Sequence, residues 1–397
     1  MLKDIELEQA QEIVMSRARA LSAESVPLLH ALGRFVAEDI KAEYAMPPTA
    51  QAAMDGYAVS SLTPGRYQVI ERLGPTQVSR ALLVQGQAVQ VVTGGVLPEG
   101  TVAVVQEEAV QLEDEYIVCN QPLENGENIK PIGENFLTGD LLIFKGACFS
   151  PGMASVLGSY GKNKVQLYRQ PKVALLNLGG DIVSCEETPA LGQMRDSNAM
   201  HLAGLIMQEK GLITETAAAG REDLAQKGKL LAHMLDEADI VITIGGAAHG
   251  ETDQAYPLIE SSGAEILFWG VQIKPGSHTG ASLLGDKWII TLPGNPSACA
   301  VSYHLIVAPL LRAMQGQSPC YKTVQALCAD KFTKKGGPRR FLLATALAGA
   351  KGWRVSILPG QKSSMTKAFL GKCNALIDLP AGHPPVAKGE EVAVILL

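Results

Sequence analysis

The sequence lacks the features that mark membrane and nucleic-acid-binding proteins. It contains no uninterrupted apolar run of about 18 residues, the length that a membrane-spanning helix needs. It has no long run of Lys or Arg, and its formal net charge is -6. We therefore expect no membrane span and no nucleic-acid partner bound through a basic surface.

Patterned cysteines and a targeting segment are also missing. The seven cysteines are scattered, without a C-x-x-C pair or the spacing of a zinc site. An odd number of unpatterned cysteines is typical of reduced thiols in the cytosol, and we interpret Cys299 and Cys373 as core residues rather than nucleophiles. The acidic, amphipathic N-terminus lacks the layout of a signal peptide. These features predict a cytoplasmic protein.

Changes of pattern along the 397 residues predict four domains, because the chain is too long for one ordinary core. Residues 1–45 and 141–170 are expected to form an N-terminal helical and linker domain. Residues 46–140 contain short apolar runs separated by Gly, Pro and Asn, which predicts a β module. We expect an α/β domain over 171–318 and a small β-barrel over 319–397.

The α/β domain is predicted from alternating strand and helix patterns. Near-continuous apolar runs indicate strands that are covered on both faces. We expect Ser197 to cap one helix and Asn295 to cap the last, with Pro296 in its first turn. The pattern predicts a doubly wound, mostly parallel sheet. The expected strands are 172–180, 212–218, 239–244, 265–273 and 287–292.

Four loops leave the ends of these strands, and the most prominent are the glycine-rich loops 245–253 and 293–297; the other two are residues 179–181 and 274–280. Ligands bind at the carboxyl ends of strands in open parallel sheets, and glycine lets the backbone approach a ligand closely. The Asn295–Pro296 junction opens a helix, so free backbone amides would favour an anion there. The alternative is that these glycines only form turns.

Charged residues share the predicted rim. Lys274 would add a positive charge, and Asp181 and Asp253 would add carboxylates, which suits a phosphorylated ligand with a divalent cation. His249 and His278 also lie in these loops. Each could transfer a proton or bind a ligand, and a solvated histidine is the simpler alternative.

Two stretches of the β module are unusual. Asp55-Gly56 lies among small residues and would by itself indicate a hairpin turn. Thr93 stands at a strand end before a double glycine. Neither stretch has the spacing of a P-loop or of a dinucleotide fingerprint.

Seven motifs occur in the order found in one family. The chain resembles the molybdopterin molybdenumtransferases (MoeA) and, over the same region, the E domain of gephyrin. The resemblance covers essentially the whole chain. The motifs are Gln51-AAMDGYAV, Val92-TGGVLPEGTVAVVQE, Gly133-EN, Arg195-DSN, Ile244-GGAAHGETD, Ile273-KPG and Leu292-PGNPSA.

This resemblance implies a four-domain homodimer. The site would lie between the MogA-like α/β domain of one subunit and the β module of the other. Such proteins insert molybdate into adenylylated molybdopterin and release AMP with the help of a divalent cation, here expected to be Mg²⁺. Other proteins of cofactor synthesis are possible partners.

The resemblance also implies roles for individual residues. Asp55, Thr93, Asp181, Asp253 and Lys274 would be catalytic, and Asp181 and Asp253 would hold the metal. The residues that would bind the pterin and phosphates are Ser197, Gly245, Gly246, Gly250, Pro293, Gly294, Asn295, Pro296 and Ser297.

The chain departs from the family pattern near the expected cation and molybdate pocket. Gly180 stands where a carboxylate is usual, and Asn135 replaces an aspartate. Lys130 replaces an arginine, and lysine and arginine are not equivalent for binding oxyanions. Ser277 and His278 replace Lys-Pro. These departures leave two alternatives open: a non-catalytic paralogue that binds molybdopterin or scaffolds a partner, and a related enzyme with another nucleotide or pterin substrate.

Overall fold

The computed structural model describes the chain except for residues 247–253, 335, 351 and 362–368. The chain folds into two compact units. One consists of Met1–Ala37 with Gly146–Leu397, and the other is Glu38–Lys145. The four-domain boundaries expected from the sequence stay a prediction.

A sheet of seven described strands lies at the centre of the larger unit, in the order β1-β19-β21-β22-β18-β14-β17. β21 runs antiparallel to both of its neighbours, and the other strands run in one direction. The predicted mostly parallel sheet is therefore confirmed. Its strands are β1 (Leu2–Ile5), β14 (Lys172–Asn177), β17 (Leu212–Ala218), β18 (Ile240–Ile244), β19 (Glu265–Val271), β21 (Gly280–Leu284) and β22 (Lys287–Leu292).

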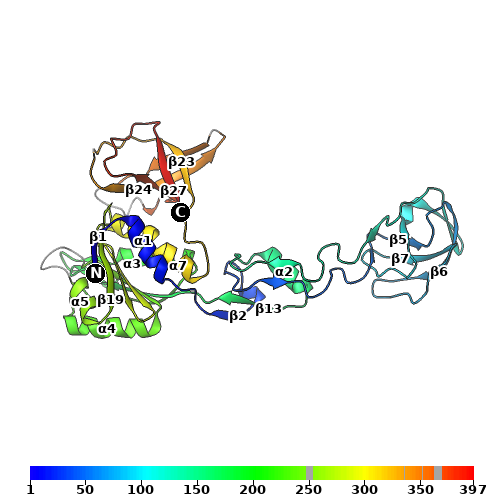
Figure 1. The fold of residues 1–397 in the computed structure, drawn as a ribbon, viewed down its shortest axis with the longest axis horizontal. Helices are drawn as coiled ribbons and strands as arrows, with labels where there is room; N and C mark the ends of the chain where they lie inside the picture. Colours follow the sequence, from blue (N-terminus) through cyan, green and yellow to red (C-terminus); the bar gives the residue numbers. More distant parts are fainter. Residues whose placement is uncertain (247–253, 335, 351, 362–368) are drawn as a thin grey trace. The chain divides into compact units, whose positions relative to one another are not determined.

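Helices cover both faces of this sheet (Figure 1). Leu175 and Ile242 pack against the helices of one face, and Leu176 and Val241 pack against those of the other. Successive side chains of a strand point to opposite faces, so both sets must be apolar. The first face carries α1 (Leu7–Arg17), α3 (Ser197–Gln208), α6 (Pro296–Ser302), the π-helix η3 (Tyr303–Val307) and α7 (Ala308–Met314), and the second carries α4 (Leu224–Glu237) and α5 (Ala255–Ser261).

The last three helical segments on the first face form one continuous helix, Pro296–Met314. Within the described chain it is the helix whose length and hydropathy would suffice to cross a membrane, but 89% of its apolar window is buried in the protein, as in a core helix. The predicted cap is confirmed, because the Asn295 side chain accepts hydrogen bonds from the amides of Ser297 and Ala298.

The first 17 residues lie in the α/β core, although the sequence pattern grouped them with residues 141–170. β1 pairs in parallel with β19, and Leu7 and Val14 of α1 are buried in the main core. Local periodicity carries no signal for a pairing between such distant segments. The next residues do meet the later segment, because β2 (Ala23–Pro27) pairs with β13 (Lys164–Tyr168), close in sequence to α2 (Pro151–Ser159).

The C-terminal region forms the expected small barrel. Five of the described strands close in the order β24-β25-β23-β27-β26, with β26 pairing back to β24. β20 (Ile273–Lys274) pairs in parallel with β24, and Phe341 belongs to the α/β core cluster, so barrel and sheet pack together. The barrel strands are β23 (Thr323–Cys328), β24 (Arg339–Gly349), β25 (Gly352–Ile357), β26 (Ala375–Leu379) and β27 (Glu391–Leu396).

The unit Glu38–Lys145, all of which is described, contains the β module that was expected over residues 46–140. Six of its strands form a sheet in the order β8-β5-β7-β6-β10-β9 around Tyr57, Val105 and Ile117, and two short ladders complete it. The strands are β3 (Ile40–Lys41), β4 (Gln51–Ala52), β5 (Gly56–Val59), β6 (Gly65–Arg72), β7 (Gln87–Val91), β8 (Ala103–Gln106), β9 (Val110–Glu113), β10 (Tyr116–Cys119), β11 (Ile129–Lys130) and β12 (Leu141–Ile143).

Candidate functional site

The loops that leave β14, β18 and β22 line one cavity of about 1510 Å³ in the larger unit. These strands are parallel neighbours, so their carboxyl ends meet at the same edge of the sheet. The loop before β21 also reaches this edge, because β21 runs in the opposite direction. The predicted site residues on the lining are Asp181, Gly245, Gly246, Lys274, Pro293, Gly294, Asn295 and Ser297.

Two of the glycine loops touch each other. Gly245 and Gly246 have φ angles of +72° and +69°, which other residues adopt only with strain. A Cβ on Gly294 would lie 3.3 Å from the Cα of Gly245. The buried Asn198 side chain donates a hydrogen bond of 2.8 Å to the carbonyl of Gly294. Glycine therefore allows the two loops to meet, and Asn198 holds one of them.

The helix that begins at Pro296 is capped internally. The Asn295 Oδ1 accepts from the amides of Ser297 and Ala298 at 3.1 and 3.3 Å and from the Ser297 hydroxyl at 2.7 Å. The amide of Cys299 donates to the Asn295 carbonyl. The amides of Ser297 and Ala298 are therefore not free, contrary to the expectation from the sequence, because the cap residue already occupies them. Binding of an anion at this turn stays a prediction. The positive end of the helix dipole still faces this loop.

Basic side chains from two domains share the cavity wall. Lys274 of β20 lies beside Arg340 of β24 in a parallel pairing, and Lys331 and Lys334 line the same cavity. Of the described carboxylates, Asp181 and Asp330 belong to the lining, and Asp330 accepts a hydrogen bond from the amide of Ile357. This wall favours an anionic ligand.

The barrel wall of the cavity was missed by the sequence analysis. The run Lys331-Phe332-Thr333-Lys334 follows the first barrel strand and is visibly basic. That run was the available signal. Local pattern does not tell which loop of a barrel faces another domain, and the β20–β24 pairing decides it. Asn198 was also missed, although it ends the quoted motif Arg195-DSN.

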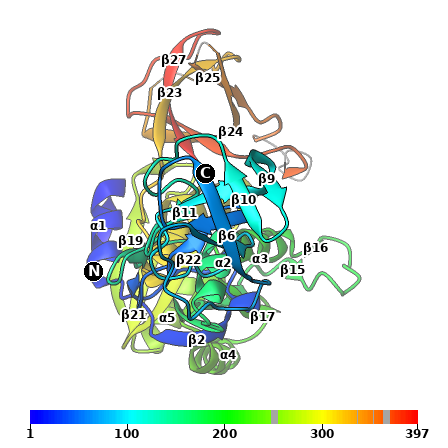
Figure 2. The same cartoon turned by 90° about the vertical axis from the view of Figure 1, so that its right-hand side faces the viewer.

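Asp181 lies at the base of an arm. β15 (Ile182–Val183) and β16 (Met194–Arg195) form a short parallel pair that projects from the α/β domain (Figure 2). The Asp181 carbonyl accepts from the amide of Met194 at 2.9 Å. The Asp181 side chain is exposed on the cavity lining, so the backbone fixes this residue while its carboxylate stays available.

Several expected residues lie elsewhere. Ser197 does not cap α3; the Asp196 carboxylate accepts from the amide of Ala199 at 2.9 Å, so Ser197 is the first residue inside the helix. Neither Ser197 nor Pro296 is on the described cavity lining. Gly250, Asp253 and His249 lie outside the described residues.

Asp55 and Thr93 meet in the β module. The amide and hydroxyl of Thr93 donate to the same Asp55 oxygen at 2.7 and 2.8 Å. These two hydrogen bonds lower the pKa of the exposed Asp55 carboxyl. Asp55 leads into β5 and forms no hairpin turn with Gly56. A Cβ on Gly56 would lie 2.0 Å from the Val105 carbonyl oxygen, so glycine is needed there for strand packing.

The structure also places two of the substituted positions and the two cysteines that were expected in the core. Ser277 and His278 line the cavity, and their side chains are 3.4 Å apart. Cys299 is buried and Cys373 is partly buried. Burial raises the pKa of both thiols, which agrees with core residues rather than nucleophiles.

Comparisons with known proteins cover nearly the entire chain. The model of the MoeA N-terminal region (domain I and II) matches residues 5–161, a probable molybdopterin binding domain matches 174–313, and the MoeA C-terminal region (domain IV) matches 325–397.

Curated relatives and a solved structure agree with these matches. The chain is 30% identical over 403 residues to a molybdopterin molybdenumtransferase of Staphylococcus aureus (strain MSSA476), covering 99% of this chain and 95% of the relative. A molybdopterin molybdenumtransferase of Staphylococcus epidermidis (strain RP62A) is also 30% identical, with the same coverage. The structure of a molybdopterin biosynthesis MoeA protein from Pyrococcus horikosii superposes with a TM-score of 0.87 at 29% identity over 99% of both chains. The chain belongs to the MoeA family.

Proposed function

We propose that this protein is a molybdopterin molybdenumtransferase of molybdenum cofactor biosynthesis, which inserts molybdate into adenylylated molybdopterin and releases AMP. The observation that carries the proposal is the cavity where the glycine loops of the α/β domain meet the basic wall around Lys274 and Arg340. Both substrates are anions, and one carries a pyrophosphate. A cavity of this charge suits them.

Residues of different chemistry would have different roles in this reaction. Gly245, Gly246 and Gly294 let the backbone approach the pterin and its phosphates. Lys274 and Arg340 offset the negative charge that grows on the phosphate oxygens as the adenylate bond breaks. The Asp55–Thr93 pair would reach this site from the β module of a partner subunit, so the active form would be a homodimer.

Mg²⁺ is the cation that we propose, because it is commonly held by one or two carboxylates together with substrate phosphates. Asp181 offers one exposed carboxylate on the lining. Within the described residues, no group of three or more His, Cys, Asp or Glu side chains could hold a metal ion. In the proposed site, phosphate oxygens and water would complete the coordination. Asp253 is the second proposed ligand. The bound cation would neutralise charge on the pyrophosphate.

The test follows AMP release by the purified protein with adenylylated molybdopterin, molybdate and Mg²⁺. We expect AMP release together with formation of active cofactor. Lys274→Met should lower turnover about 100-fold, the usual effect of removing one group that stabilises transition-state charge. Lys322→Met, at an exposed position, is the matched control.

One result would contradict the proposed activity, and another would contradict the role of Lys274. Binding of adenylylated molybdopterin without AMP release would favour the non-catalytic paralogue, and then Asn135→Asp with Ser277→Lys should restore activity. Equal turnover of Lys274→Met and the control would remove the assigned role of Lys274. We also propose that the protein is located in the cytoplasm, where its thiols would stay reduced.

A further inference from the structure

A lysine is buried behind the cavity, and lysine side chains are rarely buried in proteins. Lys227 of α4 is 5% exposed. Its Nζ donates to the Gln254 Oε1 at 2.7 Å and to the Gly220 carbonyl at 3.3 Å. Both acceptors are neutral oxygens. Gly220 belongs to the connection between β17 and α4, and Gln254 belongs to the connection between β18 and α5. Lys227 itself is not on the described cavity lining.

The Gly220 contact supports the loop after β14. The position of a Cβ on Gly220 would lie only 2.0 Å from the Gly179 carbonyl oxygen, so the two backbones touch. The amide of Ala219 donates to the Asn177 carbonyl at 2.8 Å, and the Asn177 side chain accepts from the amide of Gly179 at 2.9 Å. A shift of Gly220 would therefore move the loop that carries Asp181.

The Gln254 contact supports Gly246, which follows β18. The backbone amide of Gln254 donates to the Gly246 carbonyl at 2.7 Å. A Cβ on Gly246 would lie 3.5 Å from the Cβ of Gln254 and 3.0 Å from that of Leu178. Gly246 lines the cavity. A displacement of Gln254 would therefore remove a contact that holds Gly246 in the cavity wall.

We propose that Lys227 is a positioning residue that sets the spacing between the loop of Asp181 and Gly246. It does so from behind, through one hydrogen bond to each connection, and it touches no ligand. An ammonium is suited to this place because it has three donors and no acceptor, so one atom can bind both connections. Its importance for catalysis rests on the function proposed above, whereas its effect on the two loops does not.

The first experiment measures amide hydrogen exchange of the free protein. Lys227→Met keeps the length of the side chain and removes its donors. Lys229→Met, at an exposed position of the same helix, is the matched control. We expect exchange at Gly179 and Gln254 to become at least about tenfold faster in Lys227→Met only, because local opening costs less free energy when a supporting bond is lost. Unchanged exchange relative to Lys229→Met would overturn the proposal, whatever reaction the protein catalyses.

The second experiment separates positioning from general stability. In Lys227→Met we expect the Mg²⁺ concentration for half-maximal AMP release to rise about tenfold, as for other residues that orient metal ligands. Lys227→Arg, which keeps the donors, should recover part of this loss. Equal Mg²⁺ dependence in Lys227→Met and Lys229→Met would contradict the effect on the Asp181 loop.

A third variant applies even where Lys227→Met folds poorly. Gln254→Met removes one acceptor and leaves the bond to Gly220. It should speed exchange at the Gln254 amide and leave exchange at Gly179 close to that of the wild type. The opposite pattern, with faster exchange at Gly179 alone, would overturn the assignment of one bond to each loop.

Discussion

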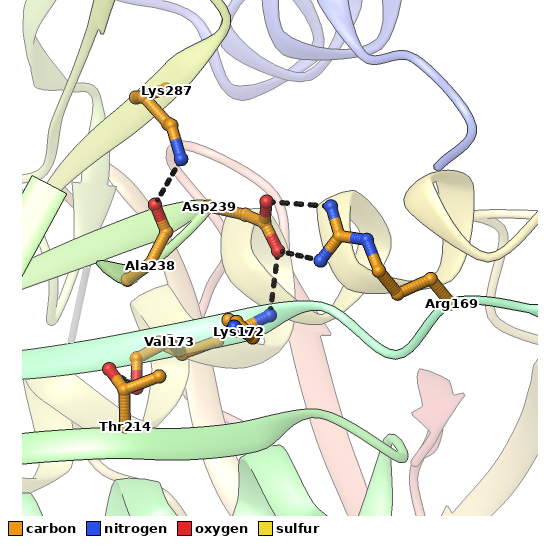
Figure 3. A network of polar contacts seen from close by, with 7 residues as sticks. All are labelled: Arg169, Lys172, Val173, Thr214, Ala238, Asp239 and Lys287. Carbon is orange, nitrogen blue, oxygen red and sulfur yellow. Dashed lines mark hydrogen bonds and ion pairs between the residues drawn. The ribbon is translucent and has the colours of Figure 1, made fainter. Parts of the chain in front are cut away.

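On the scale of single residues, the ion pair between Asp239 and Arg169 holds the start of β18 in the α/β domain (Figure 3). Asp239 directly precedes β18, at the opposite end of that strand from the cavity. Both Arg169 Nη atoms donate to its carboxylate at 2.7 and 2.9 Å, and the amide of Lys172 donates at 2.8 Å. Burial alone would raise the pKa of Asp239, but the hydrogen bonds from Arg169 and Lys172 outweigh it and lower the pKa.

Asp239→Asn should therefore destabilise the protein in a pH-dependent way. A depressed native pKa means that the stabilisation is complete above the ordinary aspartate pKa of about 3.9 and is lost as the pH falls through the native value. We expect a loss of about 2 kcal/mol near pH 7, typical of hydrogen bonds to a charged group, and a smaller difference near pH 2. Denaturant midpoints at several pH values measure it, with exposed Asp236→Asn as the control. A difference independent of pH would contradict the ion-pair explanation.

Whole elements meet at the cavity because parallel strands share one edge. The loops after β14, β18 and β22 were found from the sequence, because glycine runs after apolar segments are local features. The capping of Pro296–Met314 by Asn295 was also predicted, whereas the occupancy of its first amides was not. The sequence analysis missed β21 because it assigned residues 274–280 to a loop. The strand Gly280–Leu284 is defined by its pairing with β19 and β22, which local pattern does not reveal.

Gly245→Ala should affect the binding of adenylylated molybdopterin more than the stability. Alanine at φ +72° costs about 1 kcal/mol, and its methyl group would point toward Gly294, whose Cα lies 3.6 Å away. Gly263→Ala has a similar φ of +78° and nothing within 4 Å. We expect similar losses of unfolding free energy for both variants and weaker binding, by calorimetry, for Gly245→Ala alone. Equal affinities would show that this loop does not contact the ligand.

On the scale of the whole molecule, Arg339 joins the barrel to the α/β domain. Its guanidinium binds the Asp378 carboxylate of β26 at 2.7 and 2.8 Å and also pairs with Glu8 of α1. The hydrogen bond from Arg339 lowers the pKa of Glu8. Arg339 precedes Arg340 on β24, beside Lys274 of β20, so the same strand links the two domains and supplies the basic wall.

Arg339→Met should loosen this junction. We expect a lower denaturant midpoint and a higher KM for adenylylated molybdopterin, because Arg340 loses its support. Glu8→Gln removes only the more exposed pair and should cost below about 1 kcal/mol. Measuring KM and the denaturant midpoint for both variants tests whether Arg339→Met has the larger effect. An unchanged KM in Arg339→Met would show that Arg340 is positioned by the strand pairing alone.

The sequence by itself determined the features that depend on neighbours along the chain. Buried strands, their glycine turns, the Asn295 cap and the β character of both flanking regions follow from local periodicity and backbone sterics. Its motifs also identified the family, since their order is more specific than any single one of them.

Tertiary structure alone decided which distant segments meet. It brought β1 into the α/β sheet, Arg340 beside Lys274, and Lys227 behind two cavity loops. It also showed that Asp196, rather than Ser197, caps α3. Pairing, packing and burial between remote residues depend on the folded chain as a whole, and a local pattern of side chains carries no record of them.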